Sequence, residues 1–472
     1  MSDSNFSNDD LSNKQQAALL KEALDKSRIV LKSGKGTLPP PDILEALVHY
    51  CIEEGHANDA LEISVALLQF EPFSADAWHA NSMALANCND LNGAIDSIKK
   101  ALSLNPSDIG IRVSDIMLQE HKREKEISYK AYSELLQEFP GNDEILYALG
   151  QFHEKHNNYN SAIKIFQFLL SSDEFRKHAL SDLGYCYDSL HDYENALHYY
   201  DEYLNIDPYD ATVWFNKAVV LCHLERYNDA IDCYDFALAI KADFAGAWYN
   251  RGNALGTIGR LKESIESYRN ALQFESNDVA TWHNLGSSLE ETGEFLEAIE
   301  AFTMALHYDA HHFESYYGRG SCYDALEKYS TALSDYNKAL ELSPTYGEVV
   351  YAKAEALYNL KRIEESLEYY EHALTLIPND MDCQLDYAIT LSENKEFQKA
   401  ESILENIIKT KPDWSTVYYE MSRVKAAQND IPSMKSYLKK SLQLESTSLL
   451  DVLEDFSMYC PESEIVTLYN TL

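Results

Sequence analysis

The chain has 472 residues, of which 45% are hydrophobic, and its 39 Lys and Arg residues stand against 77 Asp and Glu residues, a formal net charge of −38. Such an acidic surface repels nucleic-acid phosphates and anionic lipid headgroups, so we expect neither nucleic-acid nor membrane binding. The eight cysteines form no CxxC pair and no apolar stretch reaches about 18 residues. We therefore expect a cytoplasmic protein with protein or peptide partners, although the acidity also serves to keep a long chain in solution.

Residues 1–40 precede the repeated part of the chain. Residues 1–10 are polar and predict a disordered tail, and residues 11–32 carry a weak helical stripe of Leu, Ala, Ile and Val. The segment SGKGTLPPP (33–41) predicts a linker, because its glycines and prolines end a helix. SGKGT shares letters with a phosphate-binding loop, but the upstream glycine and the preceding strand are missing from the sequence, so we interpret it as linker.

A pattern with a period of 34 residues fills residues 41–448, as twelve blocks without an insertion or deletion. Counting the first residue of each block as position 1, the blocks of 211–312 share Trp at position 4, small residues at 8 and 20, an aromatic at 24 and Ala at 27. Seven of the twelve prolines stand at position 32: Pro72, Pro106, Pro140, Pro208, Pro344, Pro378 and Pro412. A fixed period of this length indicates a repeat architecture built from helix pairs.

The residue types at these positions have a physical reason. Small residues at 8 and 20 allow two antiparallel helices to approach closely, and large residues at 4, 11, 24 and 28 fill the space beside them. Proline at 32 ends the second helix. This pattern resembles the tetratricopeptide repeat family, most clearly in 177–210 and 313–346. The resemblance implies an all-α fold, an α-solenoid of about twelve helix pairs in a right-handed superhelix whose first helices line a concave channel.

Two stretches depart from the pattern. Block 109–142 has Arg112 at position 4, Ile116 at position 8 and the polar run HKREKE where a compact turn belongs. This predicts a weak interface, and hence a bend between repeats 1–3 (41–142) and repeats 4–12 (143–448). Residues 449–472 predict a C-terminal cap, in which Val452, Phe456 and Tyr459 take positions 4, 8 and 11 of a thirteenth first helix.

Asparagines recur on the side of the first helix that should face the channel. Positions 2, 6, 9 and 13 point away from positions 4, 8 and 11, which we expect to form the packed face. Position 6 holds Asn216, Asn250 and Asn284 in successive repeats, and Asn253 stands at position 9. Amides both donate and accept, so such a row could hold the backbone of an extended peptide. It is similar to the asparagine ladder in the repeat domain of O-linked N-acetylglucosamine transferase; the alternative is that these amides are only solvated.

Position 5 could supply side-chain contacts beside the asparagines. Tyr249, His283 and Tyr317 stand there, although packing inside the repeats would equally explain these rings. The repeat 279–312 contains no Lys or Arg but several Glu residues. It is therefore a candidate for docking a basic segment, or else simply a solvated acidic face.

The sequence offers little support for catalysis. His153 with His156, and His307 with His311 and His312, come nearest to metal-ligand spacing, but neither group has an HExxH frame or a Cys pair. The residues outside the repeats are too few for a catalytic domain. We therefore predict no enzyme activity, no catalytic residue, no metal site and no cofactor.

These patterns together predict a non-catalytic scaffold that binds extended peptide or protein segments in the concave channel, as an adaptor or a chaperone-like assembly factor. Two alternatives stay open. One is a structural scaffold that self-associates, with residues 1–32 or the cap in a neighbour's groove. The other is a non-catalytic targeting subunit of an enzyme complex.

Overall fold

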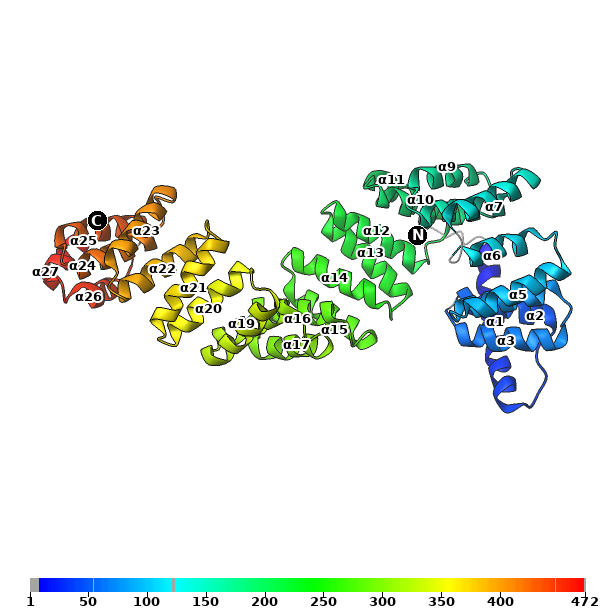
Figure 1. Cartoon of the computed structure of the whole chain (residues 1–472), viewed down its shortest axis with the longest axis horizontal. Coiled ribbons are helices and arrows are strands. Elements are labelled where there is room, and N and C mark those ends of the chain that lie inside the picture. Colours follow the sequence, from blue (N-terminus) through cyan, green and yellow to red (C-terminus); the bar gives the residue numbers. More distant parts are fainter. Residues whose placement is uncertain (1–7, 54, 121–123, 446, 471–472) are drawn as a thin grey trace, which may run out of the picture. The chain divides into compact units, whose positions relative to one another are not determined.

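The computed structural model describes residues 8–53, 55–120, 124–445 and 447–470. Within these residues the chain forms 27 α-helices and no strand, and it is an all-α solenoid (Figure 1). The helices divide into two compact units, Met1–Leu224 and Glu225–Leu472. Among the described residues, no helix is both long and apolar enough to cross a membrane.

The N-terminal unit begins with a single helix and continues as helix pairs. Its helices are α1 (Asn8–Ser33), α2 (Pro41–Glu53), α3 (Ala57–Phe70), α4 (Ala75–Asn87), α5 (Leu91–Leu104), α6 (Ile109–Gln119), α7 (Lys125–Glu138), α8 (Asp143–Lys155), α9 (Tyr159–Leu169), α10 (Arg176–Ser189), α11 (Tyr193–Ile206) and α12 (Ala211–His223). Residues 8–10, which we assigned to the polar tail, are helical, and residues 1–7 lie outside the described part of the chain.

The C-terminal unit continues with the same alternation of helices. It contains α13 (Tyr227–Ile240), α14 (Ala245–Thr257), α15 (Leu261–Phe274), α16 (Val279–Glu291), α17 (Phe295–Tyr308), α18 (Phe313–Ala325), α19 (Tyr329–Leu342), α20 (Gly347–Asn359), α21 (Ile363–Leu376), α22 (Met381–Glu393), α23 (Phe397–Thr410), α24 (Ser415–Ala427), α25 (Ile431–Leu444), α26 (Leu449–Phe456) and α27 (Glu462–Asn470).

The period read from the sequence sets where the helices begin. Eleven of the twelve first helices start at position 1 of their block, and α10 starts one residue earlier, at Arg176. The departing block 109–142 forms α6 and α7, and residues 121–123 of its polar run lie outside the described residues. The bend between 41–142 and 143–448 stays a prediction.

A left-handed residue closes the turn between the two helices in eleven of the twelve pairs. Position 15 has a positive φ in eleven blocks: Gly55, Asn89, Asn157, His191, Glu225, Gly259, Gly293, Glu327, Lys361, Lys395 and Asn429. The corresponding residue of block 109–142, Arg123, lies outside the described residues. Only glycine adopts this conformation without a steric penalty, so most of these turns are strained.

We expect Glu327→Gly to stabilise the C-terminal unit by about 0.5–1 kcal/mol, because Glu327 has a φ of 59° and glycine relieves that strain. The change is measured as the midpoint of thermal unfolding. Glu327→Gln is the control, since it removes the charge and keeps the strain. An equal gain from both variants would assign the effect to charge and contradict the role of the turn.

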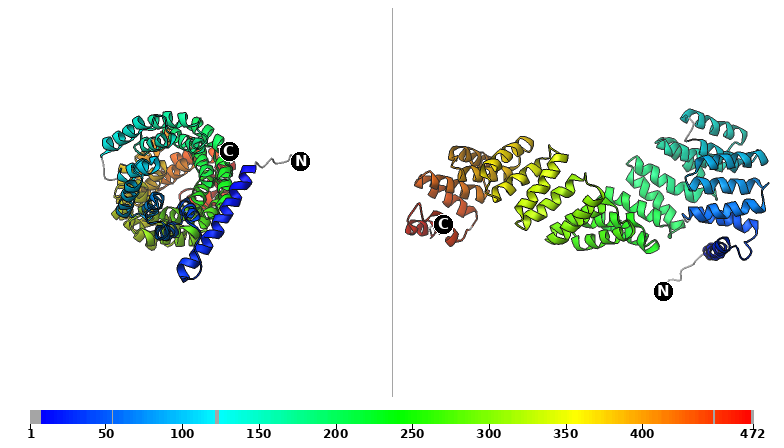
Figure 2. Two further views of the ribbon diagram at one scale, coloured as in Figure 1. Left: turned by 90° about the vertical axis from the view of Figure 1, so that its right-hand side faces the viewer. Right: turned by 60° about the horizontal axis from the view of Figure 1, so that its bottom comes forward.

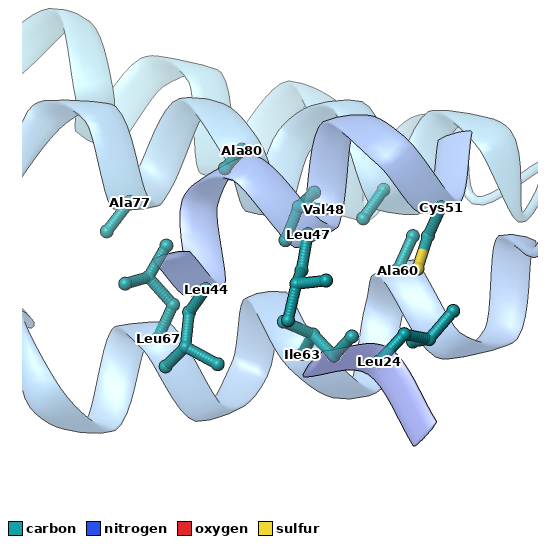
Figure 3. Close-up of a cluster of buried hydrophobic side chains, with 11 residues drawn as sticks. Leu24, Leu44, Leu47, Val48, Cys51, Ala60, Ile63, Leu67, Ala77 and Ala80 are labelled. Atoms are coloured by element: carbon teal, nitrogen blue, oxygen red, sulfur yellow. The ribbon is translucent and has the colours of Figure 1, made fainter. Parts of the chain in front are cut away.

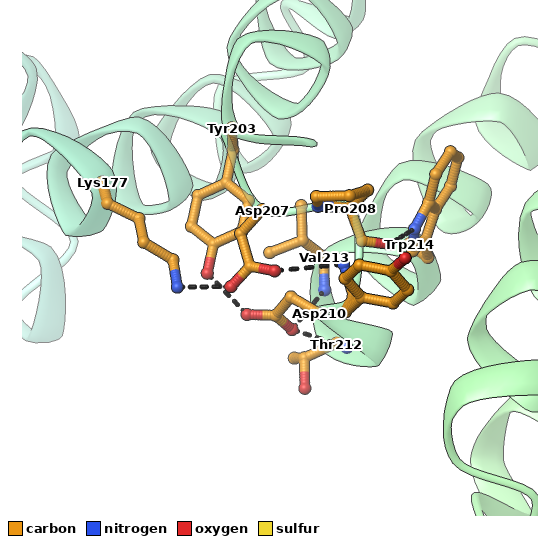
Figure 4. A network of polar contacts seen from close by, with 9 residues as sticks. Lys177, Tyr203, Asp207, Pro208, Asp210, Thr212, Val213 and Trp214 are labelled. Atoms are coloured by element: carbon orange, nitrogen blue, oxygen red, sulfur yellow. Dashed lines mark hydrogen bonds and ion pairs between the residues drawn. The ribbon is translucent and has the colours of Figure 1, made fainter. Parts of the chain in front are cut away.

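The turn between successive repeats is held by polar contacts (Figure 4). Asp210 accepts the backbone N–H groups of Thr212 and Val213 at 2.9 and 3.2 Å and thereby caps α12. The Tyr203 hydroxyl donates to the other oxygen of Asp210 at 2.6 Å. Trp214, at position 4, donates its indole N–H to the carbonyl of Pro208 at position 32, 2.9 Å away.

The same bond from position 4 to the preceding position 32 recurs along the chain. Donors and acceptors are Trp78 and Pro72, Trp248 and Ala242, Trp282 and Ser276, Gln384 and Pro378, and Tyr418 and Pro412. Position 4 therefore serves the turn as well as the packed face: Trp282 packs half-buried against a core cluster and also donates to the turn. Positions 3 and 10 are buried more deeply, as Val213 and Val220 show with 2% and 0% exposure.

Position 8 packs against position 24 of the same repeat, as the sequence predicts. A Cβ atom added at Gly184 would lie 2.4 Å from the ring of Tyr200, and one added at Gly252 would lie 2.6 Å from the ring of Tyr268. The aromatic ring thus occupies the space that a side chain at position 8 would need. The close approach of the two helices therefore depends on a small residue at position 8 facing a large ring at position 24.

α1 lies at the N-terminal end of the first stack (Figure 2). Leu24 of α1 is buried to 2% exposure in a cluster with Leu44, Leu47 and Ile63 of α2 and α3 (Figure 3). Arg28 adds an ion pair with Asp59 of α3, at 2.7 Å. The weak helical stripe of residues 11–32 therefore covers the apolar face that the first pair would otherwise expose.

α26 and α27 cover the last repeat at the other end of the chain. Val452 and Phe456 of α26 are fully buried in a cluster with Met434 and Leu438 of α25. Tyr459, which we placed on the same face, is 38% exposed instead. Met434 stands at position 20, where the other repeats have a small residue, and it is buried in the same cluster as Phe456 of the cap.

Candidate functional site

The first helices of each unit present one face on which six positions lie together. At 100° per residue, positions 2, 5, 6, 9, 12 and 13 fall within an arc of about 120°. We call these positions the channel face. Six of the seven residues predicted as peptide-binding lie on it in the C-terminal unit: Tyr249, Asn250, Asn253, His283, Asn284 and Tyr317. Asn216 lies on α12, in the N-terminal unit.

Asn253, Asn284 and two tyrosines form one hydrogen-bonded cluster. The Asn284 amide donates to Oδ1 of Asn253 at 3.0 Å and to the hydroxyl of Tyr249 at 3.3 Å. The hydroxyl of Tyr268, on α15, donates to the same Oδ1 of Asn253 at 2.7 Å. These amides therefore brace neighbouring repeats, and Nδ2 of Asn253 and Oδ1 of Asn284 are the polar atoms they have left to offer a ligand.

The asparagines are neither sealed between helices nor fully in solvent. Asn216, Asn250, Asn253 and Asn284 are all half-buried on their first helices. Asn250 stands one turn before Asn253 on α14, so both amides can reach the same stretch of a bound chain. A half-buried amide exchanges less water for a ligand than an exposed one, which favours a net gain from each hydrogen bond.

His283 faces Ser315 of the next repeat and His312, the last residue of its own repeat. Its Nδ1 lies 3.2 Å from the hydroxyl of Ser315, which also lies 2.9 Å from Nδ1 of His312. Burial, followed by the nearby His312, lowers the pKa of His283 to about 4. His283 is therefore neutral at physiological pH and can offer a ligand a hydrogen bond or an aromatic ring, but not a positive charge.

Tyr317 lies among aromatic rings and carboxylates. Its ring centre is 6.2 Å from that of Tyr336 and 6.3 Å from that of Tyr346. Burial raises the pKa of its hydroxyl, with further contributions from Glu290, Glu348 and other acidic neighbours. Tyr317 is therefore a neutral hydroxyl in a negative environment.

A hydrogen bond from position 5 to position 6 of the next repeat recurs within both units. Besides Tyr249 and Asn284, Tyr351 donates to Asp386 at 2.5 Å, and Nε2 of His79 lies 2.8 Å from the hydroxyl of Ser114. The sequence did not indicate this link, because it joins residues 35 apart whose side chains meet only after the repeats stack. Part of the polar row on the channel face is therefore used by the stack itself.

Several carboxyl groups of the channel face have raised pKa values. Burial raises the pKa of Glu355 to about 7, with Asp386 and Asp324 adding to the effect. Burial likewise raises the pKa of Asp324 to about 6 and the pKa values of Asp386 and Glu290. These carboxylates are held close together and short of compensating charge, which sequence spacing alone did not reveal.

The histidines with ligand-like spacing do not converge. Nδ1 of His156 lies 2.7 Å from the carbonyl of Phe152 at the end of α8, and His307 lies in the last turn of α17. His312 caps α18, and its Nδ1 lies 3.3 Å from the N–H of Ser315. Within the described residues, no group of three or more His, Cys, Asp or Glu side chains could hold a metal ion.

Comparison with protein-family models gives several matches along the chain. Models described as tetratricopeptide repeat or TPR repeat match residues 75–108, 218–259, 245–278, 279–312, 313–346 and 361–423. A model described as anaphase-promoting complex, cyclosome, subunit 3 matches residues 155–237. No curated protein sequence matches the chain.

Solved structures with a similar fold share little sequence with the chain. The match with a chain of the anaphase-promoting complex hetero-tetramer Cut9-Hcn1 covers 91% of this chain and 96% of the other chain, at 14% sequence identity and a TM-score of 0.44. The match with YrrB, described as a TPR protein with an unusual peptide-binding site, covers 40% of this chain and 98% of the YrrB chain, at 21% sequence identity and a TM-score of 0.36. The match with the C-terminal part of a TPR repeat-containing protein from Cytophaga hutchinsonii covers 50% of this chain and 97% of the other chain, at 18% sequence identity and a TM-score of 0.45.

Proposed function

Because the chain belongs to the tetratricopeptide repeat family, we propose that it is a non-catalytic scaffold that holds extended peptide or protein segments against its channel face. Repeat arrays of this kind bury one side of each helix pair in the stack and leave an extended concave surface for a partner. An adaptor or a chaperone-like assembly factor would use the chain in this way. Basic segments are the partners that the acidic surface favours.

One observation carries the proposal. Asn250, Asn253 and Asn284 are half-buried at channel-face positions of neighbouring first helices of one unit, and the bond between Asn284 and Asn253 leaves Nδ2 of Asn253 and Oδ1 of Asn284 unused. A row of amides meets the alternating N–H and C=O groups of an extended backbone, whatever its side chains. Each hydrogen bond adds about 0.5–1.5 kcal/mol, so the rings of Tyr249, His283 and Tyr317 would have to supply the remaining affinity.

We expect Asn250→Ala/Asn284→Ala to weaken the binding of such partners by about fivefold to a hundredfold, because two amide contacts within one unit are lost. The test is a pull-down from cell lysate with wild type and variant, quantified by mass spectrometry, followed by titration of the recovered segment as a synthetic peptide.

The matched control is Asn228→Ala/Asn406→Ala, which removes two exposed amides from second helices. It should leave binding unchanged. Equal retention of every partner by the wild type and the Asn250→Ala/Asn284→Ala variant would remove these asparagines from the proposal. Because Asn284 also braces Asn253, Asn250→Ala alone is the variant with the least effect on the stack.

A second candidate function is a subunit of a larger assembly, and the match of residues 155–237 to the anaphase-promoting complex model supports it. Self-association through residues 1–32 has less support, because α1 already buries Leu24 against its own chain. The mass of the full chain from light scattering separates a scaffold for partners from one that assembles with itself. The cysteines of the described residues form no disulfide bond, which supports a reducing compartment such as the cytoplasm.

A further inference from the structure

Charge is distributed unevenly over the channel face of the C-terminal unit. On α14 the channel face carries no charged side chain, only Gly246, Tyr249, Asn250, Asn253, Gly256 and Thr257. On α16, α18, α20, α22 and α24, all fully described, the same positions hold Glu290, Glu291, Glu314, Asp324, Glu348, Glu355, Asp382, Asp386, Glu393 and Glu420. The one cation at these positions is Arg423, which pairs with Glu420 at 3.2 Å.

The other cations of the same helices lie off the channel face, three of them at position 7 and Lys425 at position 11, where it pairs with Glu401 of α23. Arg251 pairs with Asp235 of α13 at 2.7 Å, and Arg319 pairs with Asp335 of α19 at 2.8 Å. Lys353 lies over the ring of Tyr369 on α21, 3.9 Å from its centre. The unit thus neutralises acidic groups of its second helices and leaves those of the channel face without matching cations.

Tyr317 lies at the centre of this acidic surface, which combines aromatic rings with the carboxylates. Glu290 of α16 and Glu355 and Glu348 of α20 stand on the channel face of the two first helices that contact α18, and they raise the pKa of the Tyr317 hydroxyl. The rings of Phe313 and Tyr346 lie 5.2 Å apart beside it, and Tyr346 is 37% exposed. Oδ1 of Asp324, also on α18, is buried without a hydrogen-bond partner among the described residues.

We propose that the channel face of α16, α18, α20, α22 and α24 binds an extended segment through its lysine and arginine side chains, with Tyr317, Glu290 and Glu355 as the central subsite. This rests on the proposed function, since it specifies the partner of the same channel. A cationic side chain is attracted both to the face of an aromatic ring and to the carboxylates beside it. The neutral face of α14 adjoins this surface and would hold backbone without selecting charge.

The test uses the full chain and three labelled 15-residue peptides, in which Gly-Ser alternates with Lys, Gln or Glu at every third position. We expect the Lys peptide to bind at least about tenfold more tightly than the Gln peptide in fluorescence anisotropy at low salt, and the Glu peptide not to bind. The preference should decline as salt rises, because exposed charges are screened. Equal binding of the Lys and Gln peptides would overturn the proposal.

The matched variants each remove three carboxyl groups, on two different surfaces. Glu290→Gln/Glu355→Gln/Asp386→Asn alters the channel face and should abolish the preference for Lys. Glu364→Gln/Glu368→Gln/Glu371→Gln alters exposed residues of α21 and should retain it. An equal loss in both variants would mean attraction to overall charge and would overturn the proposed subsite. Glu355→Gln alone, which removes a single poorly solvated charge, repeats the test where the triple variant folds poorly.

The outcomes separate this inference from the proposed function. If the Gln peptide binds and its binding depends on Asn250, the scaffold holds backbone and only the selection of basic segments is wrong. If the Lys preference depends on Glu290 and Glu355 but not on Asn250, the carboxylates recognise the partner and the asparagines do not.

Discussion

Gly252→Ala is expected to destabilise the C-terminal unit by about 1–3 kcal/mol, although alanine is the better helix former. A Cβ atom at Gly252 would lie 2.6 Å from Cε1 and 2.8 Å from Cδ1 of Tyr268. Tyr268 is itself only 3% exposed, and its hydroxyl is bonded to Asn253, so the ring has little freedom to move. The gain in helix propensity, about 1 kcal/mol, is therefore smaller than the cost of displacing the ring.

The same helix supplies the control. Gly256, four residues later on α14, has only the hydroxyl of Ser264 within reach of an added Cβ, at 3.4 Å. Gly256→Ala should therefore be neutral or stabilise by up to about 1 kcal/mol. Hydrogen exchange of the α14 and α15 amides measures both variants locally, which suits a repeat array whose unfolding is not a single transition.

The double variant Gly252→Ala/Tyr268→Leu tests the cause. Leucine lacks the ring that the new methyl group would meet, so part of the loss should be recovered relative to Tyr268→Leu alone. If Gly252→Ala protects α14 as much as Gly256→Ala does, the pairing of positions 8 and 24 is not what sets the distance between the helices.

Much of this architecture could be predicted because it depends on residues close in sequence or on the strict period. The pairing of Gly252 with Tyr268 follows from small residues at 8 and large ones at 24, which recur every 34 residues. The starts of the first helices follow from the same register. Each block contacts mainly its neighbours, so local rules are repeated and reinforce one another.

The features that the sequence did not reveal depend on side-chain directions after stacking. Trp282 packs against the core as expected, but the sequence did not reveal that its indole N–H also reaches the carbonyl of Ser276 in the turn. Asn253 and Asn284 were expected to face a ligand, yet they bond to each other, and Asn284 also donates to Tyr249. A rotation of some tens of degrees about the helix axis decides such contacts, and a helical wheel does not resolve it.

The raised pKa of Glu355 gives the C-terminal unit a pH dependence with a definite sign. Its folded pKa of about 7 lies above the ordinary value of 4.5, first because of burial and then because of Asp386, Asp324 and Asp380. Between these two pH values the folded state binds more protons than the unfolded state. The free energy of unfolding therefore falls as the pH rises from about 4.5 to about 7. The upper bound of this loss is about 3 kcal/mol, and partial contact with solvent reduces it to about 1–2 kcal/mol.

Glu355→Gln is accordingly expected to stabilise the unit by about 1–2 kcal/mol at pH 8 and to change little at pH 5, where Glu355 is already protonated in the folded state. Hydrogen exchange of the α20 and α21 amides at the two pH values, corrected for the intrinsic exchange rate, measures the difference. Glu364→Gln, an exposed change on α21, should have the same small effect at both. A gain from Glu355→Gln that is equal at pH 5 and pH 8 would contradict a raised pKa.

The same carboxyl group connects stability to binding. A lysine or arginine side chain placed beside Glu355 and Asp324 favours their ionised forms, so binding releases protons from whichever of them is protonated. The affinity for the Lys peptide should therefore increase between pH 5.5 and pH 8. Bound Lys peptide should also offset the decrease in the free energy of unfolding that ionisation of these carboxylates causes in the free protein. The Gln peptide, which brings no charge, should show no such increase.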